Sequence, residues 1–399
     1  MQKFLRLFLL LGCAAQLTLA VQGATDIGVV NVNADSKTIP VRVTGNTPEL
    51  NALAYQAFKA HGRYRLPASG PYTYEINFTA VGATQVRVDV TKGMAASAVF
   101  SETVSGASAR NALLRAADLA VEKTNGLGLK GFFTAKLAFI SERTGKPEVY
   151  TSDLFCGEVK QITRDNAFAL MPRWSPDGTK IIYTSYFKSG FPDIYLIDLA
   201  ATHRDTFMSV KGTNLGARYS PNGRQVAMVL SGTGTSEIWV SDAQGRGLVR
   251  KTHSELVKSS PCFSPDGTRL VFSSEPGPQL YVMPVNGGDM RRVTTGLSSF
   301  CAEPDWSRAD PNKIAYTAKV NGSYQIAVLD LASGKNEQVS HAGFDGQEPT
   351  WLPDGRHLVY TARDRRSSVL CILDTETGVS APISKGLGAS ALQASVWAP

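Results

Sequence analysis

The stretch RWSPDGTKIIYTS, residues 173–185, decides the fold. In it an aromatic residue, Trp174, precedes a Ser-Pro-Asp-Gly turn, and a β-rich segment follows the turn. Proline fixes φ, aspartate bonds its own backbone and glycine accepts a positive φ, so this tetrapeptide reverses the chain tightly. We therefore predict that it joins two neighbouring strands of an antiparallel sheet.

The same pattern recurs at a regular interval. Aromatic residues of this kind stand at positions 174, 219, 263, 306, 351 and 397, which are 43 to 46 residues apart. That interval is typical of a propeller blade of four strands and roughly 40–45 residues. The turn repeats as SPNG, SPDG and LPDG, whereas an insertion at 308–312 replaces it in the fourth copy. We expect the aromatics to pack between blades, and we expect Asp177, Asp266 and Asp354 to shape turns rather than to catalyse.

The two ends of the repeat region complete each other. Residues 137–140, 148–153 and 160–163 supply three strands with no aromatic strand before them, and a strand around Trp397 is left over. Joined, these four strands make one blade, which gives six in all and removes the exposed edges of an open ring. The sequence therefore predicts a mainly β chain with a six-bladed propeller over residues 129–399.

Residues 25–128 lack the repeat and predict a small α/β domain. The apolar periodicity indicates two helices, at 48–61 with Thr47 as a possible N-cap and at 108–123. Alternating patterns indicate strands, at 27–32, 39–43, 72–78, 85–90 and 98–104.

The first residues have the composition of an export signal. Lys3 and Arg6 precede an apolar run at 7–15 that is too short and too interrupted to span a bilayer. We expect residues 1–24 to be a signal peptide, cleaved after Ala20 or near residue 24, and the mature chain to be periplasmic. The alternative is a lipobox, Leu-Leu-Gly-Cys, which would make Cys13 a lipidated N-terminus. No other run is long enough to cross a membrane.

Common catalytic signatures do not occur in the sequence. It contains no G-x-S-x-G, no P-loop and no G-x-G-x-x-G between a strand and a helix. The five histidines, at 61, 203, 253, 341 and 357, have no metal-ligand spacing, so a metal site would require convergence in three dimensions. The basic runs at 291–292 and 363–366 are typical of solvated surface, and nothing resembles a nucleic-acid platform. We expect neither a cofactor nor a nucleic-acid partner.

Four cysteines follow the leader, at 156, 262, 301 and 371, without the CxxC spacing of zinc sites. Export permits disulfides. Cys262 and Cys301 enter neighbouring repeats and are the candidate pair, and the alternative is that they are small buried residues.

The chain resembles the TolB family of periplasmic propeller proteins of the Tol–Pal system. The likeness rests on the repeated W-S-P-D-G pattern, on the junction from AADLAVEK at 116–123 into GFFTAKLAF at 131–139, and on the terminal Trp-Ala-Pro. It implies a non-enzymatic scaffold, expected to be monomeric, that binds the lipoprotein Pal through the propeller and helps maintain the outer membrane and its constriction at division. It also implies contact with TolA through the N-terminal arm, but residues 25–36 do not clearly carry the family's pattern.

The resemblance places the Pal contacts on loops that enter the innermost strands. Two of these loops keep an E-P-x-W pattern, and in the other two the residue identities differ. The candidate partner-binding residues are Glu303, Pro304, Glu348, Pro349, Thr213, Asn214, Ser259 and Ser260. Charge reversal at both glutamates is expected to weaken Pal binding without unfolding the ring, and the alternative is that the glutamates only cap their loops.

A second reading of the same sequence is an exported propeller that binds a glycan or a peptide in its channel. An aromatic- and carboxylate-lined closed channel would favour that reading, and binding of Pal would favour the scaffold. A third reading is a propeller enzyme, which clustered carboxylates at the channel mouth would favour.

Overall fold

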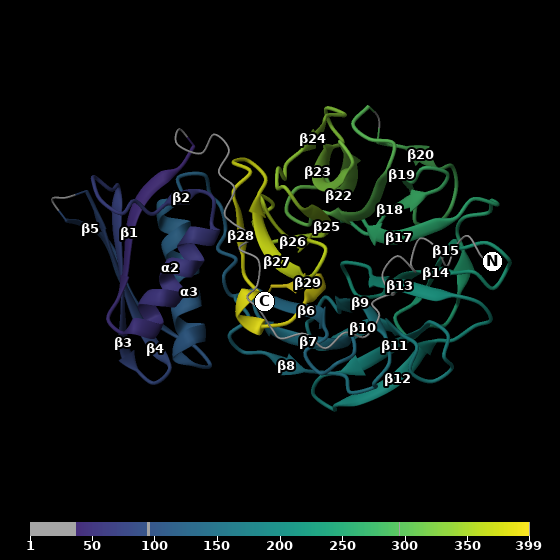
Figure 1. Ribbon diagram of the computed structural model, residues 1–399, viewed down its shortest axis with the longest axis horizontal. Coiled ribbons are helices and arrows are strands. Elements are labelled where there is room, and N and C mark those ends of the chain that lie inside the picture. Colours follow the sequence, from purple (N-terminus) through teal and green to yellow (C-terminus); the bar gives the residue numbers. More distant parts are fainter. Residues whose placement is uncertain (1–36, 94–95, 295, 399) are drawn as a thin grey trace.

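The computed structural model describes residues 37–93, 96–294 and 296–398. Over these ranges the chain forms a six-bladed β-propeller beside a smaller unit of one sheet and two helices, as Figure 1 shows. This arrangement confirms the predicted fold class. The signal peptide, the strand expected at 27–32, the arm at 25–36 and Cys13 lie outside the described residues.

Each blade is an antiparallel sheet of four strands, with the innermost strand facing the centre of the ring. Blade 1 consists of β29 (Ala391–Trp397), β6 (Lys136–Ser141), β7 (Glu148–Asp153) and β8 (Lys160–Gln161). Blade 2 consists of β9 (Ala169–Trp174), β10 (Lys180–Ser185), β11 (Asp193–Asp198) and β12 (His203–Met208). Blade 3 consists of β13 (Asn214–Tyr219), β14 (Gln225–Leu230), β15 (Glu237–Asp242) and β16 (Val249–Arg250).

The remaining blades follow in chain order. Blade 4 consists of β17 (Lys258–Phe263), β18 (Arg269–Ser274), β19 (Gln279–Pro284) and β20 (Arg291–Arg292). Blade 5 consists of β21 (Cys301–Trp306), β22 (Lys313–Val320), β23 (Ser323–Asp330) and β24 (Asn336–Gln338). Blade 6 consists of β25 (Asp345–Trp351), β26 (His357–Arg363), β27 (Ser368–Asp374) and β28 (Ser380–Pro382), followed by the short helix η1 (Lys385–Leu387).

The last strand of the chain closes the ring, as the sequence predicts. β29 pairs antiparallel with β6, so blade 1 takes its inner strand from the C-terminus. The register differs from the expected one by a single residue, because Val396, not Trp397, lies at the position that Trp174 occupies in blade 2. Trp397 instead packs beside Trp174, with ring centroids 6.0 Å apart, and its indole N–H donates to the carbonyl of Pro176 at 3.1 Å.

The Ser-Pro-Asp-Gly turns have the structural role predicted for them. In blade 2, Asp177 Oδ1 accepts the Ser175 hydroxyl at 2.5 Å and the Thr179 N–H at 3.1 Å. Gly178 adopts φ of 69°, which a residue with a side chain rarely does. The aromatics that precede the turns pack between blades: Phe263 shares a core with Ala227 and Val229 of the blade before it.

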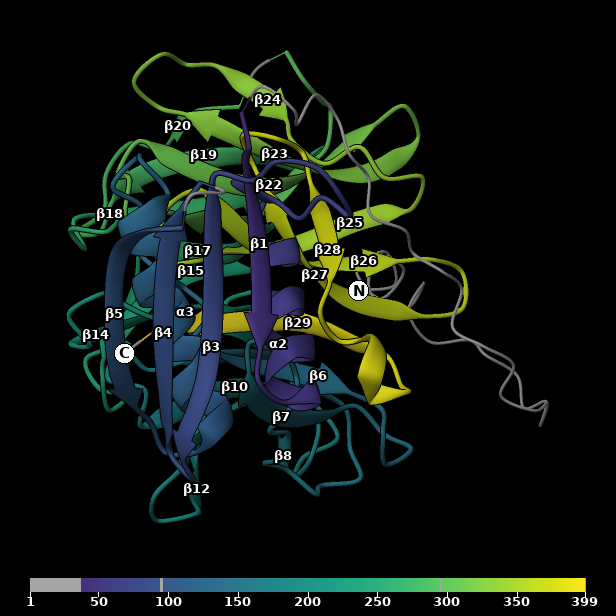
Figure 2. The same cartoon turned by 90° about the vertical axis from the view of Figure 1, so that its left-hand side faces the viewer.

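The smaller unit is a mixed sheet covered on one face by two helices. Its strand order is β2 (Tyr64–Arg65), β1 (Ile39–Gly45), β3 (Tyr74–Gly82), β4 (Gln85–Lys92) and β5 (Ser97–Ser105). The helices are α2 (Pro48–Ala60) and α3 (Ala109–Thr124), each N-capped by a hydroxyl side chain, from Thr47 and Ser108. Figures 1 and 2 show both helices between the sheet and the propeller.

The two units share one hydrophobic core. Phe58 of α2 and Phe133 of the connecting segment belong to the same buried cluster as Leu370 and Ile372 of blade 6. Asp118 of α3 fixes the entry into blade 1, because its carboxylate accepts the backbone N–H groups of Phe133 and Thr134 at 2.6 and 3.1 Å. The helices therefore present one face to their own sheet and another to the propeller.

Two further expectations are settled at this level. Among the described residues the cysteines are free, so a disulfide between Cys262 and Cys301 is not formed; both are buried and pack as small apolar side chains. No helix within the described ranges is long and apolar enough to cross a membrane.

Candidate functional site

Six residues, one from each inner strand, form a ring at one mouth of the propeller channel. Each has φ between 52° and 63°, the left-handed region, and each lies at or beside a register shift between the first two strands of its blade. These shifts are β-bulges, which bend a strand and redirect its side chains. We call this set the mouth ring; it consists of Met171, Gly216, Ser260, Glu303, Glu348 and Gln393.

Hydrogen bonds join consecutive members of the mouth ring. The N–H of Glu348 donates to Glu303 Oε2 at 3.1 Å, and the N–H of Gln393 donates to Glu348 Oε2 at 3.0 Å. The N–H of Met171 donates to Gln393 Oε1 at 2.8 Å. Each side chain thus satisfies the bulged backbone of the next blade, and the series fastens blades 5, 6, 1 and 2 together.

Hydroxyl groups from the second strands of blades 5 and 6 also hold the two glutamates. Thr317 and Thr361 donate their hydroxyls to Glu303 Oε2 and Glu348 Oε2, each at 2.7 Å. Burial, together with the negative charge of Glu348, raises the pKa of Glu303 from 4.5 to about 7. Near neutral pH this mouth therefore holds a carboxyl group that gains or loses a proton over a small pH change.

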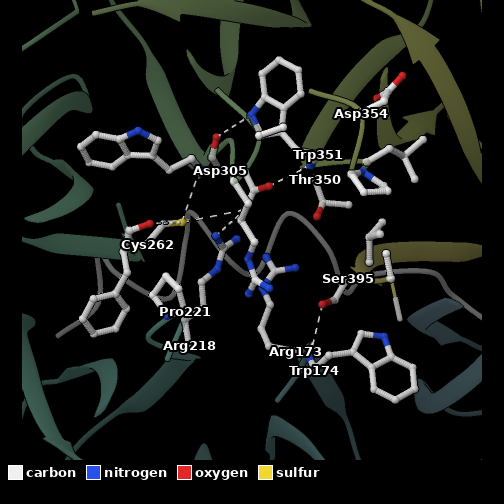
Figure 3. Close-up of a pocket in the computed structure, with 18 of the residues that line it drawn as sticks. Arg173, Trp174, Arg218, Pro221, Cys262, Asp305, Thr350, Trp351, Asp354 and Ser395 are labelled. Atoms are coloured by element: carbon white, nitrogen blue, oxygen red, sulfur yellow. Dashed lines mark hydrogen bonds and ion pairs between the residues drawn. The ribbon is translucent and has the colours of Figure 1, made fainter. Parts of the chain in front are cut away.

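Two residues further along each inner strand, a second set faces the channel. We call it the channel ring; it consists of Arg173, Arg218, Cys262, Asp305, Thr350 and Ser395. Arg218 Nη1 lies 2.6 Å from Asp305 Oδ1, which links blade 3 to blade 5 across the channel. Figure 3 shows the guanidinium groups of Arg173 and Arg218 close together in its centre.

Arg173 carries the surplus charge of this ring. Its Nη1 donates to the carbonyl of Ala394 at 3.1 Å, and Asp305 is already engaged by Arg218 and by the N–H of Trp351. Burial and the neighbouring Arg218 lower the pKa of Arg173 from 12.5 to about 10, so it stays charged at neutral pH. The middle of the channel is consequently positive.

The channel opens into a cavity on each side of this positive layer. The larger, of about 610 Å³, lies at the end of the inner strands and is lined by the inter-blade aromatics and by the linker residues 128–130. The smaller is lined by the mouth ring. Along the inner strands, the larger cavity is lined by residues that follow the channel ring and the smaller one by residues that precede it. The mouth ring therefore lies on the opposite side of the channel from the linker.

The predicted site residues divide into two groups. Glu303 and Glu348 lie in the mouth ring with Ser260, and the prolines 304 and 349 directly follow the two glutamates and are buried. Ser259 precedes Ser260, and its hydroxyl lies 2.8 Å from that of Ser273. The expected match of Ser259 and Ser260 with Glu303 and Pro304 is wrong by one residue, because Ser260 and Pro261 hold those positions in blade 4.

Thr213 and Asn214 lie away from the ring. Asn214 is buried, and its amide donates to the carbonyl of Val210 at 2.9 Å, so it anchors a loop. The expected equivalence of Thr213 and Asn214 with Glu303 and Pro304 is therefore corrected: Gly216 and Ala217 hold those positions in blade 3. Gly216 lies three residues before Tyr219, as Glu303 lies three residues before Trp306, so the interval to the aromatic residue identifies the position in the sequence.

Sequence reasoning missed Met171, Gln393 and the whole channel ring. Met171 could have been recognised from the sequence, because Pro172 follows it as Pro304 follows Glu303. Gln393 could not be found by counting back from Trp397, because Val396 and not Trp397 holds the position that Trp174 occupies in blade 2.

Comparison with known proteins decides the family. The family model described as the TolB beta propeller domain matches residues 124–399. The chain belongs to the TolB beta-propeller family. A Tol-Pal system protein TolB from Bordetella pertussis is 31% identical over 298 residues, which is 74% of this chain and 66% of that protein. The protein of the same name from Bordetella bronchiseptica matches to the same extent. The match thus spans just under two thirds of these relatives' length.

A solved structure supports the fold over nearly the whole chain. TolB from Acinetobacter baumannii has a TM-score of 0.79 at 22% identity, covering 92% of this chain and 98% of that one. At that identity the likeness concerns the fold, and it extends beyond the propeller to the smaller unit.

Proposed function

We propose that this chain is a non-enzymatic periplasmic scaffold of the Tol–Pal system that binds the lipoprotein Pal at the mouth ring. Its membership of the TolB beta-propeller family carries this proposal. In this role it helps maintain the outer membrane and its constriction during division. Contact with TolA through residues 25–36 stays a prediction from the family resemblance.

The build of the mouth ring supports partner binding. Its backbone is fastened from blade to blade, so a partner meets a surface that is already ordered and loses little free energy in ordering it. Both glutamates make their bonds through Oε2, and in the described part of the chain neither Oε1 has a hydrogen-bond partner. The two Oε1 atoms are acceptors for N–H or ammonium donors of a partner.

The repeated aspartates of the turns have a structural role in this proposal. Asp177 and Asp266 accept hydrogen bonds from their own turns, which lower the pKa of each carboxyl and hold it as a structural anion. A general acid or base at neutral pH needs a pKa near 7. Glu303 of the mouth ring has such a pKa, and we assign this carboxyl to binding because its Oε2 accepts the hydroxyl of Thr317 and the N–H of Glu348.

Calorimetric titration of the chain with the soluble domain of Pal from the same organism tests the proposal. We expect saturable 1:1 binding. If folded samples of both proteins give neither heat nor co-elution, the scaffold proposal fails.

A second candidate function is binding of a glycan or peptide in the larger cavity. Its volume of about 610 Å³, its aromatic lining and the charge of Arg173 favour this candidate. Binding of envelope glycans or peptides by a chain that does not bind Pal would select it.

A further inference from the structure

Three hydrogen-bond donors from neighbouring blades meet in the channel ring. They are the hydroxyl of Thr350 in blade 6, the hydroxyl of Ser395 in blade 1 and the guanidinium of Arg173 in blade 2. All three residues line the larger cavity, and Figure 3 shows them together in a close-up of it. Ser395 adjoins blade 2 directly, because its hydroxyl oxygen accepts the N–H of Trp174 at 3.3 Å. The inner end of the cavity is therefore rich in donors.

Arg173 leaves most of its donors uncommitted. A guanidinium carries five N–H groups that can donate hydrogen bonds. In the described part of the chain these groups have one acceptor, the carbonyl of Ala394, which lies 3.1 Å from Nη1. Thr350 is buried, and its hydroxyl has no hydrogen-bond partner among the described residues. Buried polar groups of native proteins are nearly always hydrogen-bonded, so we expect an acceptor here that the chain does not supply.

The carboxylates near Arg173 do not act as that acceptor. Asp305 is occupied, because its Oδ1 lies 2.6 Å from Arg218 Nη1 and its Oδ2 accepts the N–H of Trp351 at 2.8 Å. Asp305 and Glu348 offset part of the Arg173 charge through space. Within the described ranges, however, neither carboxylate forms an ion pair with Arg173.

The charge of the channel ring favours an anionic acceptor over water. The guanidinium of Arg218 lies close to that of Arg173, and the two positive charges repel each other in a space shielded from bulk water. A water molecule would accept the free N–H groups but would leave this repulsion in place. An anion would accept the same N–H groups and would also offset the repulsion.

The larger cavity gives such an anion both room and a route. Its volume is about 610 Å³, and it extends from the channel ring to the linker. Basic residues outnumber acidic ones in its lining, and the two acidic residues, Asp305 and Asp354, are already bonded to basic side chains. Two of the basic residues are exposed, so they attract anions from solvent toward the cavity. The basic residues of the lining are Lys130, Arg173, Arg218 and Arg308, of which Lys130 and Arg308 are the exposed ones.

We propose that Arg173, Thr350 and Ser395 bind an oxyanion, the carboxylate or phosphate group of a small ligand, at the inner end of the larger cavity. A planar guanidinium binds two oxygens of such a group at once, and the two hydroxyls donate to its remaining lone pairs. The bound anion offsets the repulsion between Arg173 and Arg218 and joins blades 6, 1 and 2 from inside the channel. The site goes beyond the scaffold role and does not depend on it, because the mouth ring lies on the other side of the channel ring.

The test uses the full chain in Tris–chloride buffer, which contains no oxyanion. Sodium phosphate and, in a separate series, sodium acetate replace NaCl at constant ionic strength while the melting temperature is measured. A ligand that binds only the folded state stabilises it, so we expect at least one of the two anions to raise the melting temperature saturably, by about 2 °C or more. The anion with the lower half-saturating concentration identifies the bound group as phosphate or carboxylate.

A pair of arginine variants locates the response. Arg173→Met should raise the half-saturating concentration roughly tenfold or more, because it removes the charged donor. Arg224→Met changes an exposed arginine that does not line the cavity, and it is the matched control. We expect this control to respond to the anions as the unaltered chain does.

Thr350→Val keeps the proposal testable if Arg173→Met does not fold. This change removes one donor and preserves the shape of the side chain, and we expect the half-saturating concentration to rise roughly threefold or more. The site is overturned if neither anion gives a saturable rise, or if folded Arg173→Met or Thr350→Val responds as the unaltered chain does. Loss of the response in Arg224→Met would place the anion at the surface and would overturn the site as well. Calorimetric titration with Pal decides the scaffold proposal separately.

Discussion

Arg218 and Asp305 meet 2.6 Å apart in the propeller channel, although 87 residues separate them in the sequence. Both side chains are mostly buried, at 14% and 16% exposure. Asp305 also accepts the N–H of Trp351 at 2.8 Å, so one carboxylate holds blades 3, 5 and 6. This ion pair is the main link across the channel, and the mouth ring links the blades around it.

Asp305→Ala should destabilise the ring. It leaves Arg218 buried beside Arg173 without a carboxylate, and we expect the free energy of unfolding to fall by roughly 2 kcal/mol or more. Adding Arg218→Met should recover part of this loss, because it removes the uncompensated charge. Chemical denaturation of the single and double variants measures both effects, and a double variant no more stable than Asp305→Ala would show that the ion pair is not the cause.

Removal of residues 391–399 should prevent stable folding. The deletion takes away β29, which pairs with β6 and whose Gln393 and Ser395 accept hydrogen bonds from β9. Blade 1 would lose its inner strand and expose an unpaired edge, which promotes aggregation. Size-exclusion chromatography and thermal melting test this, and an unchanged melting temperature would show that closure by β29 is dispensable.

The pKa of Glu303 predicts a pH-dependent stability. The folded-state pKa of about 7 lies above the ordinary 4.5, so the folded chain binds more protons between these pH values. Stability should therefore fall as pH rises from about 4.5 to about 7. Glu303→Gln keeps an acceptor for Thr317 and removes the charge, and we expect a gain on the order of 1 kcal/mol at pH 8 and none near pH 4.5. The same gain at both pH values would argue against this account.

Gly62 permits the close approach of the two units. A Cβ atom at this position would lie 2.4 Å from Cβ of Asp374, which Arg356 holds in place. Gly62→Ala should therefore lower the free energy of unfolding by about 1–3 kcal/mol. Gly343→Ala, where a Cβ meets nothing within 4 Å, is the control and should change stability little. Equal melting temperatures for the two variants would contradict the packing described here.

The structure also changes how the glutamates should be tested. Charge reversal at Glu303 and Glu348 would break the bonds to the next blades, so weaker partner binding would be confounded with weaker folding. Ser260 offers a cleaner position, because it lies in the mouth ring and makes no hydrogen bond through its side chain among the described residues.

Much of the fold follows from local sequence, whereas little of the site does. The turn around Asp177 and the interval between aromatics predict the blades and their number, because both depend on residues close together in the chain. The closure of the ring was predicted from the incomplete copies of the repeat at its two ends. Cross-channel contacts such as that of Arg218 with Asp305, and the meeting of Thr350 and Ser395 with Arg173, depend on the ring bringing distant residues together. No rule based on residue spacing predicts such contacts.

One hydrogen bond that recurs from blade to blade has a signal in the sequence that the predictions did not use. In five blades a hydroxyl group accepts the N–H of a third-strand residue fourteen positions earlier, at 2.8–3.0 Å. The signal was a Ser or Thr after each outer strand, which resembles any polar surface residue. The residues are Thr163, Thr252, Thr294, Ser340 and Ser384.

The most direct test of the account compares Pal binding by two variants on opposite sides of the channel. Ser260→Arg alters the mouth ring, and Arg308→Glu alters an exposed residue at the cavity beside the linker. With both variants folded, we predict that Ser260→Arg weakens binding of the soluble Pal domain at least tenfold and that Arg308→Glu stays within about twofold of the unaltered chain. Equal affinities for both variants, or loss of binding in Arg308→Glu alone, would contradict binding at the mouth ring.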